Sequence, residues 1–167
     1  MEIRPLSPYA VSKSSSEILL SYASRLLNFN LVHLRLSNVY GPYQISKGDM
    51  ATVIGIFENQ YKLKKPLPIV KPGNQSRRFT HIYDTVRTCY KAWKLNRCRH
   101  YSISSKKEYS ILKVAKMFKS KIKYLPKRPG ERYVSALTNV NLSNKVHKYF
   151  GKINLEDYIE DFLIKNS

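Results

Sequence analysis

The sequence is poor in cysteine and in long apolar runs. Its two cysteines, Cys89 and Cys98, are too few for a disulfide framework and do not stand at a metal-ligand spacing with histidine. We interpret them as isolated buried or half-buried thiols. No apolar run approaches the roughly 18–20 residues that cross a bilayer, and the first residues lack the apolar core of a signal peptide. We therefore expect a soluble cytoplasmic protein with no metal site and no membrane partner.

Acidic residues are also scarce. The chain has 11 Asp and Glu against 30 Lys and Arg, which gives a formal net charge of +19. Proteins that bind nucleic acid carry such an excess, but they concentrate it on one surface. Here the basic residues occur in every segment, with local clusters only at 62–65, 97–99 and 119–128. We favour a solvated lysine-rich surface and keep a basic nucleic-acid-binding protein as an alternative.

Glycine is lacking in the one pattern that a bound dinucleotide needs. A glycine-rich turn between a strand and a helix cradles the pyrophosphate of such a cofactor. The six glycines stand at positions 41, 48, 55, 73, 130 and 151 and offer no such spacing. The sequence therefore contains no recognisable dinucleotide phosphate-binding turn.

What the sequence does contain is the pattern of an α/β domain. Its 167 residues are 43% hydrophobic and 12% aromatic, enough for one core. Apolar periodicity predicts helices at 8–27, 50–63, 84–95, 110–118, 142–150 and 155–164. Short apolar runs predict strands at 31–36, 66–70, 79–83, 100–103 and 121–124, with 66–70 at an edge because of its prolines. We expect a loop at 38–47 and Asp84 as the N-cap of its helix.

The first helix carries a candidate acid/base pair. Tyr9 and Lys13 are four residues apart, so they share one helix face. A free phenol titrates near pH ~10, and a neighbouring ammonium stabilises the phenolate and lowers that pKa. The same spacing recurs at Tyr61/Lys65, Tyr90/Lys94 and Tyr109/Lys113, so spacing alone proves little. The Ser-Pro before Tyr9 and the small residues around it distinguish the first pair.

Four sequence blocks, taken together, resemble a known family. They are S-P-Y-A-V-S-K at 7–13, L-R-L-S-N-V-Y-G-P at 34–42, Q-S-R-R-F at 75–79 and R-P-G-E at 128–131. In this order and spacing they resemble the C-terminal half of an extended short-chain dehydrogenase/reductase, an NAD-dependent nucleotide-sugar epimerase/dehydratase of the UDP-glucose 4-epimerase type. The resemblance extends from about residue 5 to residue 162.

The resemblance implies a reaction and a role for each matching residue. It implies hydride transfer at sugar C4 of a UDP- or dTDP-sugar, with NAD as cofactor and Tyr9 as the acid/base. Lys13 would bind the cofactor ribose and lower the pKa of Tyr9. The implied cofactor-binding residues are Tyr9, Lys13 and Ser37. The implied substrate-binding residues are Asn38, Val53, Val70, Arg77, Arg128 and Glu131.

Two positions depart from the family's pattern. Lys71-Pro72-Gly73 replaces a Gly-Asp-Gly type of turn, and Arg78 stands where the family has Asp. We expect Arg78 to be an exposed charge rather than a ligand.

The resemblance also implies that the chain is one incomplete domain over 1–167. Residues 1–42 and 79–103 would form the end of a Rossmann-like parallel sheet, and residues 43–78 and 104–167 a small α/β substrate-binding subdomain. The glycine-rich half and the family's catalytic Ser or Thr would lie before residue 1. We therefore expect a homodimer or a complementing N-terminal half supplied in trans. A 4,6-dehydratase segment and an inactive enzyme-derived binding module remain alternatives.

Overall fold

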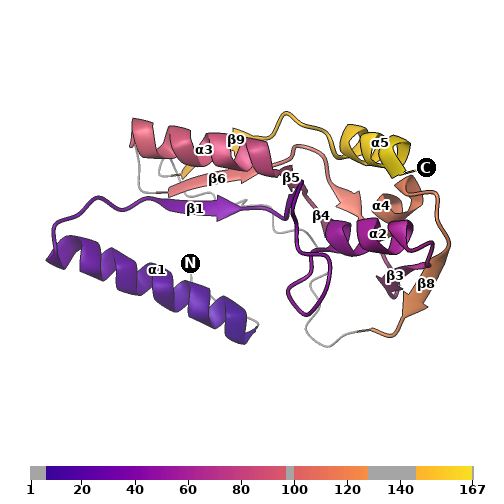
Figure 1. Cartoon of the computed structure of the whole chain (residues 1–167). Coiled ribbons are helices and arrows are strands. Elements are labelled where there is room, and N and C mark those ends of the chain that lie inside the picture. Colours follow the sequence, from indigo (N-terminus) through magenta and orange to yellow (C-terminus); the bar gives the residue numbers. More distant parts are fainter. Residues whose placement is uncertain (1–6, 97–99, 128–145, 167) are drawn as a thin grey trace.

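The computed structural model describes residues 7–96, 100–127 and 146–166. Its largest sheet contains three parallel strands in the order β1 (His33–Leu36), β6 (His100–Ser104) and β9 (Val146–Phe150). Helix α3 (Ile82–Leu95) lies on one side of this sheet and α1 (Pro8–Leu26) on the other, as Figure 1 shows. The parallel strands between helices confirm the expected α/β class.

A second group of elements holds the main hydrophobic core. It consists of α2 (Val53–Lys62), the parallel pair β3 (Leu67–Val70) and β8 (Ile122–Leu125), α4 (Ile111–Met117) and α5 (Leu155–Asn166). The short pairs β2 (Val39–Tyr40) with β5 (Thr80–His81), and β4 (Ser76–Arg77) with β7 (Tyr109–Ser110), connect this group to the larger sheet. Its buried side chains include Ile54, Phe57, Leu67, Ile69, Val114, Phe118 and Ile159.

The prediction of a helix at 142–150 is wrong over the part that the structure describes. Residues Val146–Phe150 form β9, paired in parallel with β6, and residues 142–145 lie outside the described segments. Their apolar spacing is compatible with either structure, and the edge of β6 supplies main-chain partners that select a strand. The Tyr149 ring stacks against the Tyr101 ring with centroids 6.3 Å apart.

The assignment of Asp84 as an N-cap is also wrong. Helix α3 begins at Ile82, and the capping group is His81, whose Nδ1 accepts from the Tyr83 amide at 3.2 Å. Asp84 lies in the first turn and is buried. Its Oδ2 accepts hydrogen bonds from the amides of Lys152 (2.7 Å) and Ile153 (2.9 Å). Asp84 therefore joins α3 to the segment between β9 and α5.

Helix α1 presents its polar side to the sheet. Ser21 Oγ lies 3.2 Å from His33 Nε2, and Arg35 donates to Glu17 Oε1 at 3.2 Å. Ser24 is its only described residue that is buried. Large apolar side chains on α1 and its C-terminal cap are exposed: Val11, Ile18, Leu19, Leu20, Tyr22, Leu26 and Leu27. This face lacks a partner among the described residues.

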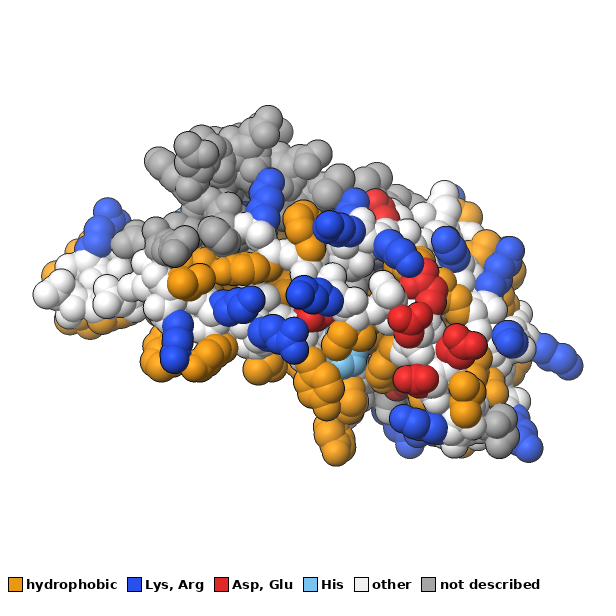
Figure 2. Space-filling view, turned by 90° about the horizontal axis from the view of Figure 1, so that it is seen from above, with side chains coloured by type: hydrophobic (Ala, Val, Ile, Leu, Met, Phe, Trp, Pro, Cys, Tyr) orange, Lys and Arg blue, Asp and Glu red, His pale blue; other side chains and the backbone are white. Residues whose placement is uncertain are grey.

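The surface carries its basic residues broadly. Figure 2 shows Lys and Arg side chains spread over the face seen from above and most of the visible acidic side chains gathered right of its centre. None of the described helices has the length and apolar character to traverse a bilayer. Cys89 is a half-buried free thiol, and Cys98 lies outside the described residues.

The role of Asp84 predicts a stability effect. Asp84→Ala leaves two partly buried amides without an acceptor, and each such loss costs about 1–3 kcal/mol when the amide is fully buried. We expect the free energy of unfolding to fall by about 2–4 kcal/mol in urea denaturation. Asp84→Asn keeps an oxygen acceptor of the same shape and should lose clearly less. Equal losses in the two variants would contradict the assigned role of the hydrogen bonds.

Candidate functional site

A cavity of about 370 Å³ opens where β2, β3 and β4 meet the start of α2. Its walls are mainly apolar, and four polar side chains interrupt them. The lining residues are Asn38, Val39, Ala51, Thr52, Val53, Ile54, Ile56, Pro68, Val70, Gln75, Arg77, Phe79, Ile111 and Leu125. An apolar cavity of this size with a few polar groups is typical of a small-molecule site.

Three of these polar side chains offer a ligand different hydrogen-bonding groups. Arg77, on β4, provides a guanidinium whose Nη1 donates to the Ser76 carbonyl at 2.7 Å. Asn38 has a left-handed backbone (φ 32°) and donates from Nδ2 to the Arg78 carbonyl at 3.3 Å. Gln75 is 1% exposed, and its Oε1 has no hydrogen-bond partner among the described residues. The cavity therefore combines a cation with an unused acceptor.

The N-terminus of α2 forms another part of the wall. Thr52 caps the helix, with its Oγ1 accepting from the Gly55 amide at 3.1 Å. The first amides of a helix point outward and attract negative charge. A β carbon at Gly55 would meet the Ile45 carbonyl oxygen at 2.5 Å, so glycine lets the loop lie directly against the helix. The amides of α2 and the Arg77 guanidinium therefore border one cavity.

A chain of hydrogen bonds holds this wall in place. Thr52 Oγ1 donates to Gln44 Oε1 at 2.9 Å, and Gln44 Nε2 donates to Glu58 Oε2 at 3.0 Å. Tyr158 of α5 donates to Glu58 Oε1 at 2.7 Å. Burial raises the pKa of Glu58 above its ordinary value, while the hydrogen bonds from Tyr158 and Gln44 and the charge of Lys62 act in the opposite direction. The Glu58 carboxyl group thus joins α5, α2 and the loop before α2.

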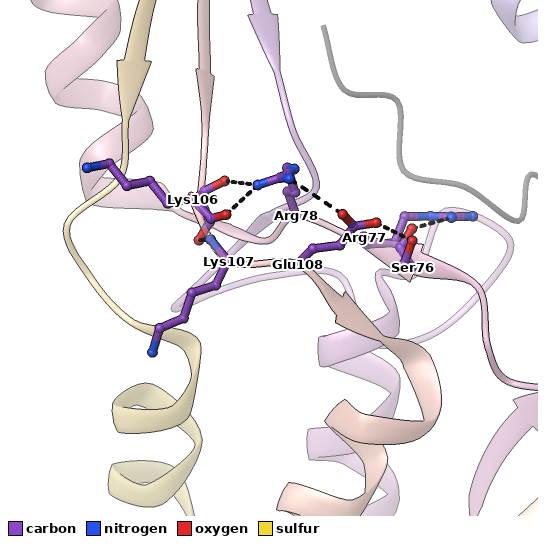
Figure 3. Close-up of polar contacts among 7 residues, drawn as sticks. Ser76, Arg77, Arg78, Lys106, Lys107 and Glu108 are labelled. Atoms are coloured by element: carbon purple, nitrogen blue, oxygen red, sulfur yellow. Dashed lines mark hydrogen bonds and ion pairs between the residues drawn. The ribbon is translucent and has the colours of Figure 1, made fainter. Parts of the chain in front are cut away.

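Arg78 contradicts its expectation as an exposed charge. Its side chain is only 16% exposed and pairs with Glu108 Oε2 at 3.4 Å. Its Nη1 also donates to the carbonyls of Ser105 (3.1 Å) and Lys106. Figure 3 shows these contacts together with the bond from Ser76 to Glu108. Arg78 therefore fixes the loop before β7, next to the cavity that Arg77 lines.

Tyr9 and Lys13 lie outside this cavity, on one face of α1. The Lys13 ammonium is 5.4 Å from the centroid of the Tyr9 ring, and both side chains are exposed. Among the described residues, no carboxylate is paired with Lys13. The pair therefore points one way, as the helical spacing predicts.

The register between α1 and β1 relates this pair to Ser37. Ser21 lies beside His33 and Glu17 beside Arg35, so four helical residues match two strand residues. Four residues of helix and two of strand each advance about 6–7 Å, so the match continues along both elements. Four further residues along α1 and two further residues along the strand direction bring Lys13 level with Ser37, at the carboxyl end of β1. That is the end from which Asn38 leads into the cavity.

Three tyrosines inside the protein are less suited than Tyr9 to act as an acid/base group. Burial raises the pKa of Tyr40, Tyr109 and Tyr158 above the ordinary phenol value. A raised pKa makes a phenolate less accessible at neutral pH. Tyr9 is the exposed phenol that has an ammonium beside it and stands at the carboxyl end of the sheet.

The structure brings together four of the residues expected to bind substrate: Asn38, Val53, Val70 and Arg77 line the one cavity. Arg128 and Glu131 lie outside the described residues. Sequence reasoning missed Gln75, Thr52 and the Gln44–Glu58 pair. Thr52 directly precedes a helix, so its N-cap position could have indicated it. Gln75 lies two residues before Arg77, in a block that resembles the family, and this was the only signal for it.

Comparison with known proteins identifies the family of this chain. The family described as NAD dependent epimerase/dehydratase matches residues 1–104. The chain belongs to this family. A Methanocaldococcus jannaschii protein provisionally named a UDP-glucose 4-epimerase is 36% identical over 137 residues, which is 78% of this chain and 44% of that protein. The dTDP-L-rhamnose 4-epimerase of Burkholderia thailandensis is 34% identical over 85 residues, covering 51% of this chain and 23% of the enzyme.

A solved structure supports the same assignment. The UDP-glucuronic acid 4-epimerase of Bacillus cereus, in complex with UDP-glucuronic acid and NAD, matches with a TM-score of 0.80 and 28% identity. The match covers 99% of this epimerase/dehydratase family member and 55% of the Bacillus enzyme. The chain thus spans about half the length of the curated relatives it matches.

Glu58 predicts a dependence of stability on pH. Its pKa is raised in the folded state, so its contribution to stability is full below the unfolded value of 4.5 and declines as the pH rises through the folded value. Glu58→Gln removes this titration. We expect the stability of the wild type relative to Glu58→Gln to decrease from pH 4 upward, as measured by urea denaturation at each pH. A difference that is constant or rises with pH would contradict the burial of the carboxyl group.

Proposed function

We propose that this chain forms the substrate side of an NAD-dependent nucleotide-sugar 4-epimerase and that catalysis requires a cofactor-binding portion from outside it. The observation that supports this most is the convergence of Asn38, Val53, Val70 and Arg77 on one cavity in a member of the epimerase/dehydratase family. Asn38 and Arg77 come from two of the four sequence blocks, and Val53 and Val70 from α2 and β3, so four separate segments of the chain meet at this cavity.

The cavity suits a nucleoside diphosphate. Its apolar walls, including Phe79 and Val70, offer a surface for a base and ribose. The Arg77 guanidinium and the first turn of α2 offer donors for a diphosphate, because planar guanidinium groups and helix N-termini both favour phosphate oxygens. The unpartnered Gln75 Oε1 offers an acceptor for a donor group of the ligand.

The catalytic proton would be held by Tyr9. During oxidation at sugar C4, the Tyr9 phenolate would take the C4 hydroxyl proton, and it would return that proton when the centre is reduced. The adjacent Lys13 ammonium, 5.4 Å from the centroid of the Tyr9 ring, would stabilise the negative oxygen through its charge. The sugar would have to reach from the cavity to the carboxyl end of β1, where the register of α1 brings these residues.

The residues present fit the ribose side of NAD. Tyr9, Lys13 and Ser37 provide two hydroxyls and an ammonium, and ribose hydroxyls can donate to and accept from such groups. The chemistry that NAD supplies when bound is reversible hydride exchange with the sugar C4. The 167 residues offer no glycine-rich turn for the pyrophosphate, so we propose that a separate N-terminal portion provides it.

The exposed face of α1 supports a requirement for a second chain. Its large apolar side chains include Ile18, Leu19 and Leu26, which are 66%, 66% and 68% exposed. Burying each one fully is worth about 1.5–3 kcal/mol. Exposed apolar patches of this kind are normally covered by a partner. We propose that another copy of the chain, or the complementing portion, covers this face.

The nucleotide-sugar proposal predicts binding without NAD. A UDP-sugar should bind weakly, and Arg77→Ala should weaken binding at least ~10-fold, because a charge-assisted hydrogen bond is worth about 1.5–3 kcal/mol. Arg87→Ala, which removes an exposed arginine of α3, is the matched control and should leave binding unchanged. Calorimetry measures both.

Two results would contradict this proposal. One is an equal loss of affinity in the two arginine variants. The other is much tighter binding of single-stranded or duplex nucleic acid with a steep salt dependence, which would favour the basic-binder alternative.

The proposal for α1 predicts self-association. The purified chain should form dimers or larger species in light scattering, and Ile18→Glu should shift it toward the monomer because it places a charge on the apolar face. Val86→Glu, on the exposed side of α3, is the matched control and should not change the distribution. A monodisperse wild-type monomer that unfolds cooperatively would rule out the proposed role of α1.

A further inference from the structure

A second cavity, of about 420 Å³, lies at the opposite end of α2 from the first. We call it the lysine pocket. Its lining residues are Tyr61, Lys62, Lys64, Lys65, Pro66, Ser120, Lys121 and Asn166. Val53 lines the first cavity and Lys62 lines the second, and the helical rise separates these two residues by about 13–14 Å. The two cavities are therefore distinct sites.

The lysine pocket has an excess of positive charge that its surroundings do not cancel. Helices α2, α4 and α5 end beside it, at Lys62, Met117 and Asn166. Each helix C-terminus is equivalent to about half a negative charge, so the three ends supply about −1.5. Glu58 acts on Lys62, which leaves Lys64, Lys65 and Lys121. These three charges exceed what the helix ends supply.

The polar side chains of the pocket match one ligand class. No acidic side chain is among its lining residues, and none of its lysines is in an ion pair within the described part of the chain. The ammonium groups, together with the hydroxyl of Tyr61, can donate to several oxygens at once, whereas the Ser120 hydroxyl already donates to the Phe118 carbonyl at 3.3 Å. A ligand with several closely spaced anionic oxygens would relieve the repulsion between the lysines.

We propose that the lysine pocket binds an oligophosphate anion. A pyrophosphate or triphosphate group carries the density of charge and acceptors that the pocket lacks, and it fits within 420 Å³. Its source is either a free oligophosphate or the phosphate chain of a nucleotide. The site does not depend on the nucleotide-sugar proposal, because it shares no lining residue with the Arg77 cavity.

Chemical protection tests this proposal at the site itself. The purified chain is acetylated briefly at low salt with and without tripolyphosphate, and mass spectrometry compares the extent of modification of each lysine. We expect Lys64, Lys65 and Lys121 to be protected, and Lys91 and Lys94 on the exposed side of α3 to react equally in both samples. Protection should persist in Arg77→Ala, which separates the lysine pocket from the nucleotide-sugar cavity.

Paired charge variants provide the binding control. Lys64→Gln with Lys65→Gln should weaken tripolyphosphate binding at least about tenfold in calorimetry, since two charge-assisted contacts are lost from a partly exposed site. Lys91→Gln with Lys94→Gln removes the same net charge elsewhere and should leave the affinity within about twofold. Equal losses in both pairs, uniform protection of all lysines, or no binding would overturn the proposal.

Comparing the affinities of a nucleoside triphosphate and of tripolyphosphate distinguishes a nucleotide from a free oligophosphate as the source of the anion. Affinity equal to that of tripolyphosphate shows that only phosphate groups are recognised. Clearly tighter binding shows an added contact with the nucleoside, and the half-buried Tyr61, whose ring also packs against Phe118 and Phe162, is the aromatic residue of the pocket wall. Either result supports recognition of the oligophosphate, and weaker binding than inorganic sulfate contradicts it.

Discussion

One half-buried carboxyl group, that of Glu58, holds the candidate substrate cavity in shape. It accepts from Tyr158 of α5 and from Gln44, and Gln44 in turn accepts from Thr52 at the start of α2. The link from Tyr158 to Glu58 joins segments 100 positions apart in the sequence, and the other two links span 14 and 8 positions. The position of the first turn of α2, and so of the donors beside Arg77, therefore depends on α5. Removal of the Glu58 carboxyl group, which does not line the cavity, would therefore loosen the cavity wall formed by the start of α2.

The two sides of α1 show a different constraint. Its sheet-facing contacts are polar, between Glu17 and Arg35 and between Ser21 and His33, whereas its large apolar residues face outward. A surface helix normally turns its apolar stripe to its own core. The reversed arrangement has a physical reason if the core that covers α1 belongs to another polypeptide. The same helix carries Tyr9 and Lys13, so the proposed assembly and the proposed chemistry share one element.

The sequence predicted the regular elements well where periodicity was unambiguous, as in α1, α2 and α5. It failed at residues 146–150, because an apolar spacing that suits a helix also suits a strand once the edge of β6 offers hydrogen-bond partners. It also failed at Asp84, where the acceptor is needed by amides 68 and 69 positions away in the sequence. Such long-range contacts leave no local pattern.

The same distinction applies to the candidate site. Asn38 and Arg77 were found because ordered blocks of sequence resemble a family, and the cavity then unites them. Arg78, which looked like a solvent-exposed charge, instead bonds two carbonyls and Glu108. Gln75 and Glu58 matter through burial, and burial of a polar residue among distant segments cannot be read from composition or spacing.

Gly55 sets a limit on how this protein can be improved by engineering. Glycine inside a helix is less favourable than alanine by about 1 kcal/mol, and replacing it is a standard route to greater thermal stability. Here the added methyl would meet the Ile45 carbonyl oxygen at 2.5 Å and push the loop away from α2. A variant selected only for a firmer helix would displace Thr52 and distort the cavity. In this segment, the close approach of the loop to α2 therefore outweighs the intrinsic helix propensity of alanine.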